Sequence, residues 1–320
     1  MRFRRVTLSV LCILLMVCAN LPAQSPLPDA KPVPHVQAVP QPYDQVSFER
    51  DGQEIACFHF GPGLNRPFVF PIIGPSGRTL TRMGHPGDPY GHSHHNSVWI
   101  SLIDVNGVDF WSDHSPNQGR IVHDRVVKLE DGDDAASVET ISHWIAHTGE
   151  VLLNERRVVR VEILPDKEWI LTIDLQLEPA SSDVRLKQQK QFGPIGVRVA
   201  KTISAQYGGG LLRNSEGVTG EKAMFRKRAK WVDYSGPVMP GVIEGLTLMD
   251  HPANPSYPSH FHVRQDGWMG ALITEAGDVV LTRGKPLHLR YGLYVHRGMP
   301  PAARIEQRWE QFAKEPAAPR

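Results

Sequence analysis

The residues best suited to chemistry in this chain are histidines gathered in one short segment, residues 85–96. Four of the fifteen histidines fall there, and three of them, His92, His94 and His95, are nearly contiguous. Imidazole transfers protons and binds metals near neutral pH, and packing alone gives little reason to concentrate it in a loop rich in glycine and proline. The strand-like run 97–103 follows at once, so we expect a functional loop held by a rigid strand.

Three interpretations of this histidine loop are open. The histidines could be hydrogen-bonded structural residues, they could bind or protonate a sugar, or they could hold a metal ion. In an extended segment His92 and His94 point to one side and His95 to the other, and a His-x-His pair with a distant third ligand is a common zinc or copper arrangement. The sequence does not choose among three candidates for that ligand: His114, His251 and His262. We therefore assign no metal ligand and predict no cofactor.

Aromatic, amide, guanidinium and carboxylate side chains gather in further segments, at 109–114, 229–236, 250–264 and 290–296. Aromatic rings stack on the apolar face of a sugar, and polar groups bind its hydroxyls, so this mixture is typical of a carbohydrate cleft. The predicted substrate-binding residues are His92, Trp111, His114, Tyr234, His251, Asn254, His262, Arg264 and Arg290. Because most of them fall on predicted loops or strand ends, we expect them to converge on one cleft with the histidine loop.

The predicted function is acid–base chemistry on a sugar or glycoside, as an epimerase, hydrolase or lyase. His94 or His95 would exchange a proton with an oxygen, and Asp250, or less favourably Asp109, would be the carboxylate partner. Two alternatives are a non-catalytic sugar-binding module and a metal-dependent enzyme that uses His92, His94 and His95. In each, the partner is a small molecule or an oligosaccharide.

Structural readings compete with these functional ones. Residues 250–255 could form a proline-rigidified turn whose Asp and Asn cap backbone groups. Trp231 and Tyr234 could be plain core residues, since large aromatic side chains are usually buried.

The elements that must position these residues are almost all strands. Leu171, Ile173, Leu175 and Leu177 alternate with polar residues, the pattern of a half-buried strand. Further runs rich in β-branched residues lie at 53–60, 67–73, 120–129, 136–147, 151–163, 192–202, 268–273, 279–282 and 287–296. Many strands separated by Gly and Pro turns predict an all-β fold, a large two-sheet β-sandwich of the galactose-mutarotase-like supersandwich kind.

Helical signal is confined to the end of the chain. Pro300 and Pro301 open a segment through residue 313 in which Ile305, Trp309 and Phe312 have helical spacing. We expect a short C-terminal helix there.

The N-terminus predicts export. Arg2, Arg4 and Arg5 precede an apolar run, and a small-residue cleavage site ends near Ala23, so residues 1–23 read as a signal peptide. Lipidation at Cys18 is an alternative. A Pro-rich linker is expected over 24–42 and a single β-sandwich domain over 43–315. The protein would then be periplasmic or secreted, with no membrane segment in its mature form.

Charge and cysteine content narrow the function further. Without the three signal-peptide arginines, 32 basic residues face 34 acidic ones, which argues against a nucleic-acid partner. Cys57 would be the one cysteine left after cleavage, so no internal disulfide can form.

The motif segments resemble the methane oxygenase PmoA-like family, a domain of unknown function in exported bacterial proteins. The resemblance covers roughly residues 45–300, and its matching pieces are 66–68, 74–77, 92–95 with Trp99, 105–111, 231–236, 250–255 and 289–291. It implies a β-rich exported protein linked with sugar catabolism. It does not imply methane oxidation, because the subunit of that name is an integral membrane protein.

Overall fold

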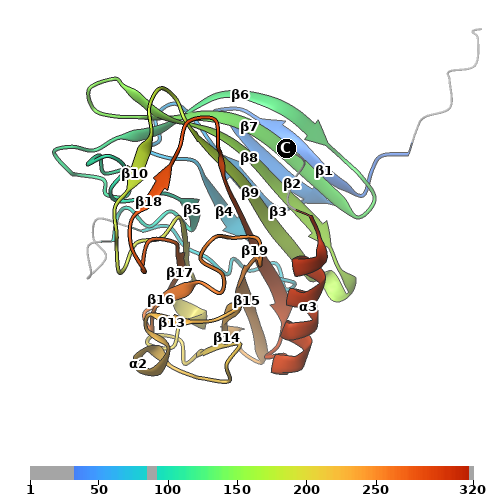
Figure 1. The fold of residues 1–320 in the computed structure, drawn as a ribbon. Helices are drawn as coiled ribbons and strands as arrows, with labels where there is room; N and C mark the ends of the chain where they lie inside the picture. Colours follow the sequence, from blue (N-terminus) through green and yellow to red (C-terminus); the bar gives the residue numbers. More distant parts are fainter. Residues whose placement is uncertain (1–31, 85–91, 317–320) are drawn as a thin grey trace, which may run out of the picture. The chain divides into compact units, whose positions relative to one another are not determined.

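The computed structural model describes residues 32–84 and 92–316. Residues from Pro34 onward form one unit, built mainly of antiparallel strands (Figure 1). The predicted signal peptide, the first part of the predicted linker and His85 lie outside the described residues.

Two large sheets account for most of the described strands. Nine strands form one sheet, in the order β1-β2-β3-β4-β5-β11-β17-β16-β13. Their bounds are Val36–Gln41 (β1), Gln45–Arg50 (β2), Gln53–His59 (β3), Phe68–Ile72 (β4), Val98–Ile100 (β5), Ile195–Arg198 (β11), Trp268–Leu272 (β17), His260–Arg264 (β16) and Lys227–Arg228 (β13).

Eight strands form the second sheet, in the order β12-β14-β15-β19-β9-β8-β7-β6. Their bounds are Leu211–Asn214 (β12), Trp231–Met239 (β14), Val242–Asp250 (β15), Leu287–Arg297 (β19), Trp169–Pro179 (β9), Val151–Ile163 (β8), Ala135–Ile145 (β7) and Arg120–Glu130 (β6). A small sheet pairs β10 (Val184–Leu186) with β18 (Val279–Leu281). The described helices are η2 (Pro165–Lys167), η3 (Lys201–Ile203), α2 (Glu221–Met224) and α3 (Ala302–Lys314).

The core lies between the two large sheets. In β9 the residues Leu171, Ile173, Leu175 and Leu177 are buried in one cluster with side chains from the nine-stranded sheet. This alternation places one face of each strand in the core, which is how a sandwich removes apolar surface from water. The predicted all-β sandwich is confirmed, and the finer likeness to the mutarotase supersandwich stays a prediction.

The predicted C-terminal helix is also confirmed, as α3. Its buried residues Ile305 and Phe312 pack against Ile170, Trp231 and Tyr294 of the eight-stranded sheet, on the face away from the main core. Figure 1 shows α3 lying alongside this sheet, next to β19.

The predicted linker is wrong over its second half. Val36–Gln41 forms β1 and pairs in antiparallel register with β2, and Val36 and Ala38 are buried. Pro40 made this strand hard to recognise in the sequence. The proline is tolerated because β1 is the edge strand of its sheet, so backbone N–H groups on its outer side do not bond to another strand of that sheet.

The structure also differs from the prediction over residues 229–236. Most of this segment forms β14 and not a loop. Trp231 and Tyr234 are buried on opposite faces of this strand, so the competing core reading is correct for both. Asp250 likewise ends β15.

Candidate functional site

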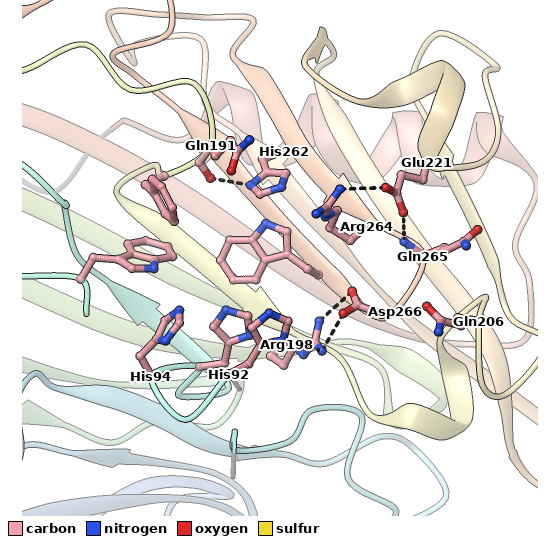
Figure 2. A pocket seen from close by; sticks show the side chains of 14 residues that line it. His92, His94, Gln191, Arg198, Gln206, Glu221, His262, Arg264, Gln265 and Asp266 are labelled. Atoms are coloured by element: carbon pink, nitrogen blue, oxygen red, sulfur yellow. Dashed lines mark hydrogen bonds and ion pairs between the residues drawn. The ribbon is translucent and has the colours of Figure 1, made fainter. Parts of the chain in front are cut away.

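A cleft of about 470 Å³ lies where β11, β17 and β16 run side by side in the nine-stranded sheet. Figure 2 shows His92 and His94 on one side of it, with His262 and Gln191 across from them. The lining residues come from the histidine loop, the 109–113 loop, these strands and the segments beside them: His92, His94, His95, Trp111, Gln191, Phe192, Arg198, Gln206, Glu221, His262, Arg264, Gln265, Asp266 and Trp268.

Glycines on the sheet make room for the floor of the cleft. Gly196 of β11 pairs with Trp99 of β5 on one side and with Gly270 of β17 on the other. A Cβ on Gly196 would lie 2.6 Å from the Trp268 ring and 3.0 Å from the Trp99 ring. The two indoles therefore rest directly on backbone that carries no side chains, which is one recognised use of glycine inside a strand.

The floor is an aromatic cluster of Trp99, Trp111, Trp268 and Phe192. The ring centroids of Trp111 and Trp268 are 5.7 Å apart with planes at 84°, and those of Trp111 and Phe192 are 5.3 Å apart at 63°. These are edge-to-face contacts, the arrangement that the aromatic quadrupole favours. Three of the four residues, Trp111, Trp268 and Phe192, line the cleft and give it a rigid apolar surface.

The histidines of the loop stack against this floor. The His95 ring lies between those of His92 and Trp268, with centroid distances of 4.4 Å and 5.0 Å and nearly parallel planes. His94 meets His95 edge-on at 4.5 Å. Because His95 is only 6% exposed and His94 is half-buried, His94 is the better placed of the two to meet a ligand.

Arg66 joins the loop that carries His94 to the loop that carries Trp111. Its guanidinium is buried and donates to three backbone carbonyls of the 110–112 segment, at 3.1, 2.7 and 3.0 Å. It also donates to the His94 carbonyl at 3.2 Å, to Asn96 Oδ1 at 2.8 Å and to Asp113 Oδ1 at 3.2 Å. A planar guanidinium has five N–H donors, so one side chain can fix both loops.

Burial keeps His94, His95 and His262 neutral. It lowers the pKa of His94 to about 4, with Asp113 opposing the shift, and it lowers the pKa of His262 to about 4 against a hydrogen bond to the Gln191 carbonyl. The pKa of His95 is lowered further, again mainly by burial. A neutral imidazole has a free lone pair, so these rings can accept protons or hydrogen bonds at pH 7.

The charged residues of the lining are paired with one another. Arg198 forms a fork with Asp266, at 2.9 Å and 3.0 Å, and the Arg198 side chain is fully buried. Nearer the rim, Arg264 donates to Glu221 at 3.1 Å. The guanidinium and carboxylate charges of these four residues cancel within the site.

Several buried polar atoms around the cleft have no hydrogen-bond partner among the described residues. They are Trp111 Nε1, Trp268 Nε1, His95 Nδ1, His262 Nε2 and Arg198 Nε. A buried polar group left unpaired costs about 1–3 kcal/mol, so native structures seldom keep several together. Water molecules or a ligand would have to supply the hydrogen-bond partners of these groups.

Six of the sequence-predicted site residues line this cleft: His92, His94, His95, Trp111, His262 and Arg264. The roles predicted for them stay predictions. Two more lie near the site without lining it. The Tyr234 hydroxyl donates to the backbone carbonyl of Arg264. Asp109 Oδ1 accepts from the Trp111 amide at 2.8 Å.

The predicted partnership of Asp250 with the loop histidines is wrong, because Asp250 does not line the cleft. Its side chain is fully buried at the end of β15, where Asn254 Nδ2 donates to Oδ1 at 2.7 Å and the Ser259 amide donates to Oδ2 at 2.8 Å. Burial raises the pKa of Asp250 to about 6. Because both carboxylate oxygens accept hydrogen bonds from the residues that follow β15, Asp250 stabilises a turn, as the structural interpretation of residues 250–255 predicts.

His251, Asn254 and Arg290 are also absent from the cleft lining, so the prediction that they share one cleft with the histidine loop is wrong. Arg290 donates to Asp174 at 2.8 Å and to Glu315 at 2.7 Å, and His251 Nε2 lies 3.2 Å from the Glu315 carbonyl. These residues attach the end of α3 to the eight-stranded sheet. His114 is exposed and does not line the cleft either.

Sequence reasoning missed Trp268, Phe192, Arg198, Asp266 and Glu221 as cleft residues. The sequence did contain a signal for Arg198, which lies between two valines in a predicted strand. An arginine is rarely buried unless it has a charged partner, so its position in an apolar strand indicates a special role. The glycines beneath Trp268 gave no such signal in the sequence, because their role depends on which strands are neighbours in the sheet.

The metal interpretation gains no ligand set from the structure. Across residues 32–84 and 92–316, no three or more His, Cys, Asp or Glu side chains form a group that could hold a metal ion.

The chain belongs to a protein family of unknown function, DUF6807, whose model matches residues 45–310. This match does not link the chain to the PmoA-like family, so that resemblance stays a prediction. No curated protein matches the chain.

Among solved structures, the chain is similar to a TPR-domain containing protein from Parabacteroides distasonis ATCC 8503, with 13% identity and a TM-score of 0.32. The match covers 83% of this chain and 49% of the other, so the chain spans about half the length of that structure. Within the described part of the chain, no helix has the length and apolar character needed to cross a membrane.

Proposed function

We propose that the cleft binds an uncharged sugar or glycoside and that His94 takes part in acid–base chemistry on it. The observation that carries this proposal is the combination, in one cleft, of flat aromatic rings with buried N–H groups that lack partners, at Trp111 and Trp268. A sugar ring matches both features. Its C–H face stacks on indole, and its oxygens accept hydrogen bonds from indole N–H.

The charge pattern supports an uncharged ligand. Arg198 is held in a fork by Asp266, and Arg264 is held by Glu221, so neither arginine is free to bind a ligand carboxylate or phosphate without losing its partner. His94, His95 and His262 are neutral at pH 7, because burial lowers their pKa values. A charged sugar would enter this site without a compensating charge and would lose its hydration.

Proton transfer by histidine fits the site better than a pair of carboxylates. Asp266 and Glu221 accept from arginines, whereas the neutral imidazole of His94 is half-buried beside the floor and can accept a proton. The resulting imidazolium would lie near Asp113, whose charge favours the protonated form. This role suits an epimerase, a lyase or a hydrolase.

The same arginine–carboxylate pairs favour a second candidate, a non-catalytic sugar-binding module. With both lining carboxylates engaged, the described cleft offers histidine but no carboxyl group without an arginine partner as a proton donor. In that case the histidines only accept hydrogen bonds from hydroxyls.

Export and the link to sugar catabolism belong to this proposal as well. They rest on the Arg-rich N-terminus and on the motif resemblance to the PmoA-like family. N-terminal sequencing of the protein after expression in a bacterium with a periplasm should find cleavage near Ala23, and retention of Met1 in the mature protein would refute export.

The binding test uses the full-length protein and tryptophan fluorescence. The probes are neutral methyl glycosides and disaccharides, set against glucuronic acid and glucose 6-phosphate. At least one neutral probe should bind, and the charged probes should bind at least tenfold more weakly. Chromatography of the incubated sugars then distinguishes an enzyme, which changes them, from a binding module, which does not.

Trp268→Phe sharpens this test, because it keeps an aromatic ring but removes the N–H donor. Binding should weaken by about tenfold, the effect of one lost hydrogen bond. Trp309→Phe is the matched control, since Trp309 donates to the Asp250 carbonyl beside α3, away from the cleft. Equal effects of the two substitutions, or tighter binding of the charged probes, would rule out the proposal.

A further inference from the structure

His262 has a fixed tautomer. Its Nδ1 makes a hydrogen bond with the backbone carbonyl of Gln191. A carbonyl oxygen can only accept, so the proton must sit on Nδ1. In the neutral ring, Nε2 then carries a lone pair and no proton.

That lone pair is buried in the cleft without a partner. His262 is 8% exposed and lines the cleft, and Nε2 has no hydrogen-bond partner among the described residues. The edges of two aromatic rings confine the imidazole, with ring centroids 5.3 Å away at Phe225 and 5.8 Å away at Trp268. The ring therefore cannot turn freely to find another donor.

Trp111 and Trp268 present the opposite polarity. Indole Nε1–H is a donor and never an acceptor, and both groups are buried and unpartnered in the described part of the chain. Among the rings of the described cleft, two indole donors are thus combined with one fixed acceptor, His262 Nε2.

We infer that the cleft selects its ligand through this fixed polar pattern, in which His262 Nε2 accepts a hydrogen bond from one ligand hydroxyl while the Trp111 and Trp268 indoles donate to ligand oxygens. His262 is then a specificity-determining residue. The inference rests on the proposed function for the class of ligand, an uncharged sugar. It adds that His262 Nε2 is the group that recognises one of its hydroxyls.

The pattern predicts discrimination at one hydroxyl. A glycoside that lacks the hydroxyl facing His262 leaves Nε2 unpaired in the complex and cannot recover that bond elsewhere. Its affinity should fall by about tenfold to a hundredfold. Removal of other hydroxyls that face solvent should change affinity by less than threefold.

Two substitutions separate the two ring nitrogens. His262→Asn keeps an amide donor near the position of Nδ1, where it can still meet the Gln191 carbonyl, but it has no group at Nε2. His262→Gln places an amide oxygen near Nε2 but gives up the Nδ1 donor. We expect His262→Asn to keep its melting temperature and to lose discrimination at the critical hydroxyl, and His262→Gln to retain part of that discrimination.

Affinity is measured for the methyl glycoside that binds best and for its monodeoxy analogues, with wild-type protein and both variants. The inference is supported if one deoxy analogue binds wild type at least tenfold more weakly and this difference disappears in His262→Asn. It is overturned if every deoxy analogue loses the same factor in wild type and in His262→Asn.

Nitrogen-15 NMR of histidine-labelled protein gives a second readout, with the His262 signals assigned from their loss in His262→Asn. At pH 7, Nδ1 should be protonated and Nε2 bare, and the Nε2 resonance should shift when the glycoside is added. A protonated Nε2, or a bound glycoside that leaves this resonance unchanged, removes the inference but not the sugar function. If no glycoside binds wild type, the sugar function fails, and the inference fails with it.

Discussion

Three histidines of the cleft, His94, His95 and His262, depart from the ordinary behaviour of imidazole because burial lowers their pKa values. A histidine in solution titrates near pH 6.5, which is the value that the sequence alone suggests. Burial lowers the pKa values of His94 and His262 to about 4. At neutral pH the site therefore works with neutral rings.

Ligand binding and any activity should be constant from pH 7 to about pH 5 and should fall as the pH drops through about 4. Below that value protonation removes the lone pairs that accept protons or hydrogen bonds. A pH series of sugar affinity measures the midpoint. A midpoint near 6.5 would show that these rings are more hydrated than their burial indicates.

The same shifts have a consequence for stability. In the unfolded chain these histidines take up protons below about pH 6.5, whereas in the folded protein they do so only near pH 4. Their contribution is therefore fully present above pH 6.5 and is lost as the pH falls towards 4. Denaturant midpoints measured between pH 7 and pH 4 should decrease, and midpoints that stay level over this range would contradict the shifts.

His94→Ala should abolish activity or weaken sugar binding by at least tenfold, and it should change the melting temperature little. His94 is half-buried and sits on a loop, so its side chain contributes little to the core. His147→Ala is the control, because His147 is exposed in the turn after β7. Normal function together with a large loss of thermal stability would favour a structural role for His94.

A chelator separates the proton-carrier role of His94 from a metal role. Proton transfer by His94 needs no metal, so chelator treatment should leave sugar binding and activity unchanged. A chelator effect that zinc or copper reverses would favour the metal interpretation.

Among the elements, β11 and β17 matter most for the cleft, because their glycines leave the space that the aromatic rings of the floor occupy. Gly196→Val should displace the Trp99 and Trp268 rings, since even a Cβ would lie 2.6 Å from Trp268. Overpacking of this kind costs about 1–3 kcal/mol of stability and should also weaken sugar binding.

Chemical denaturation and fluorescence titration measure the two effects of Gly196→Val. Gly63→Ala is the control, because a Cβ there meets nothing within 4 Å. A Gly196→Val protein with normal affinity would show that the cleft does not depend on where these rings lie.

The two loops of the site depend in turn on Arg66. Arg66→Lys keeps the charge but offers one nitrogen in place of a planar fork, so some of the carbonyls that Arg66 now satisfies would lose their donor. Each buried carbonyl left unpaired costs about 1–3 kcal/mol. We expect lower stability and weaker binding together, because His94 and Trp111 lose their common support.

Differential scanning calorimetry and sugar titration of Arg66→Lys test this support. Arg125→Lys, at an exposed arginine on β6, should change neither property. Normal sugar affinity in a destabilised Arg66→Lys protein would show that the loops are held by other contacts.

For the molecule as a whole, the residues that attach α3 form a region separate from the cleft. Arg290→Ala would leave Asp174 and Glu315 without their guanidinium, and breaking a buried ion pair costs about 3–5 kcal/mol. The melting temperature should fall while sugar affinity stays within about twofold of wild type. His94→Ala should show the reverse.

Arg160→Ala is the matched control, since its pair with Glu162 is exposed and such pairs contribute little. If Arg290→Ala weakened sugar binding as strongly as His94→Ala, the separation of the two regions would be incorrect.

The sequence by itself determined the features that depend on neighbouring residues. Alternation over residues 171–177 identified a strand with one buried face, and the spacing of Ile305, Trp309 and Phe312 identified α3. The histidine loop was recognisable as a candidate site because its histidines lie within four consecutive positions. Period and composition are local properties, so they can be read without the fold.

Tertiary structure alone decided which distant segments share the cleft. Strand order places β5, β11, β17 and β16 side by side, so Trp99, Gly196, Trp268 and His262 meet although they are far apart in the chain. The same order sends Asp250 and its neighbours to the other sheet, where they hold α3. Pairing and register arise from long-range contacts between whole strands, and no short stretch of sequence specifies them.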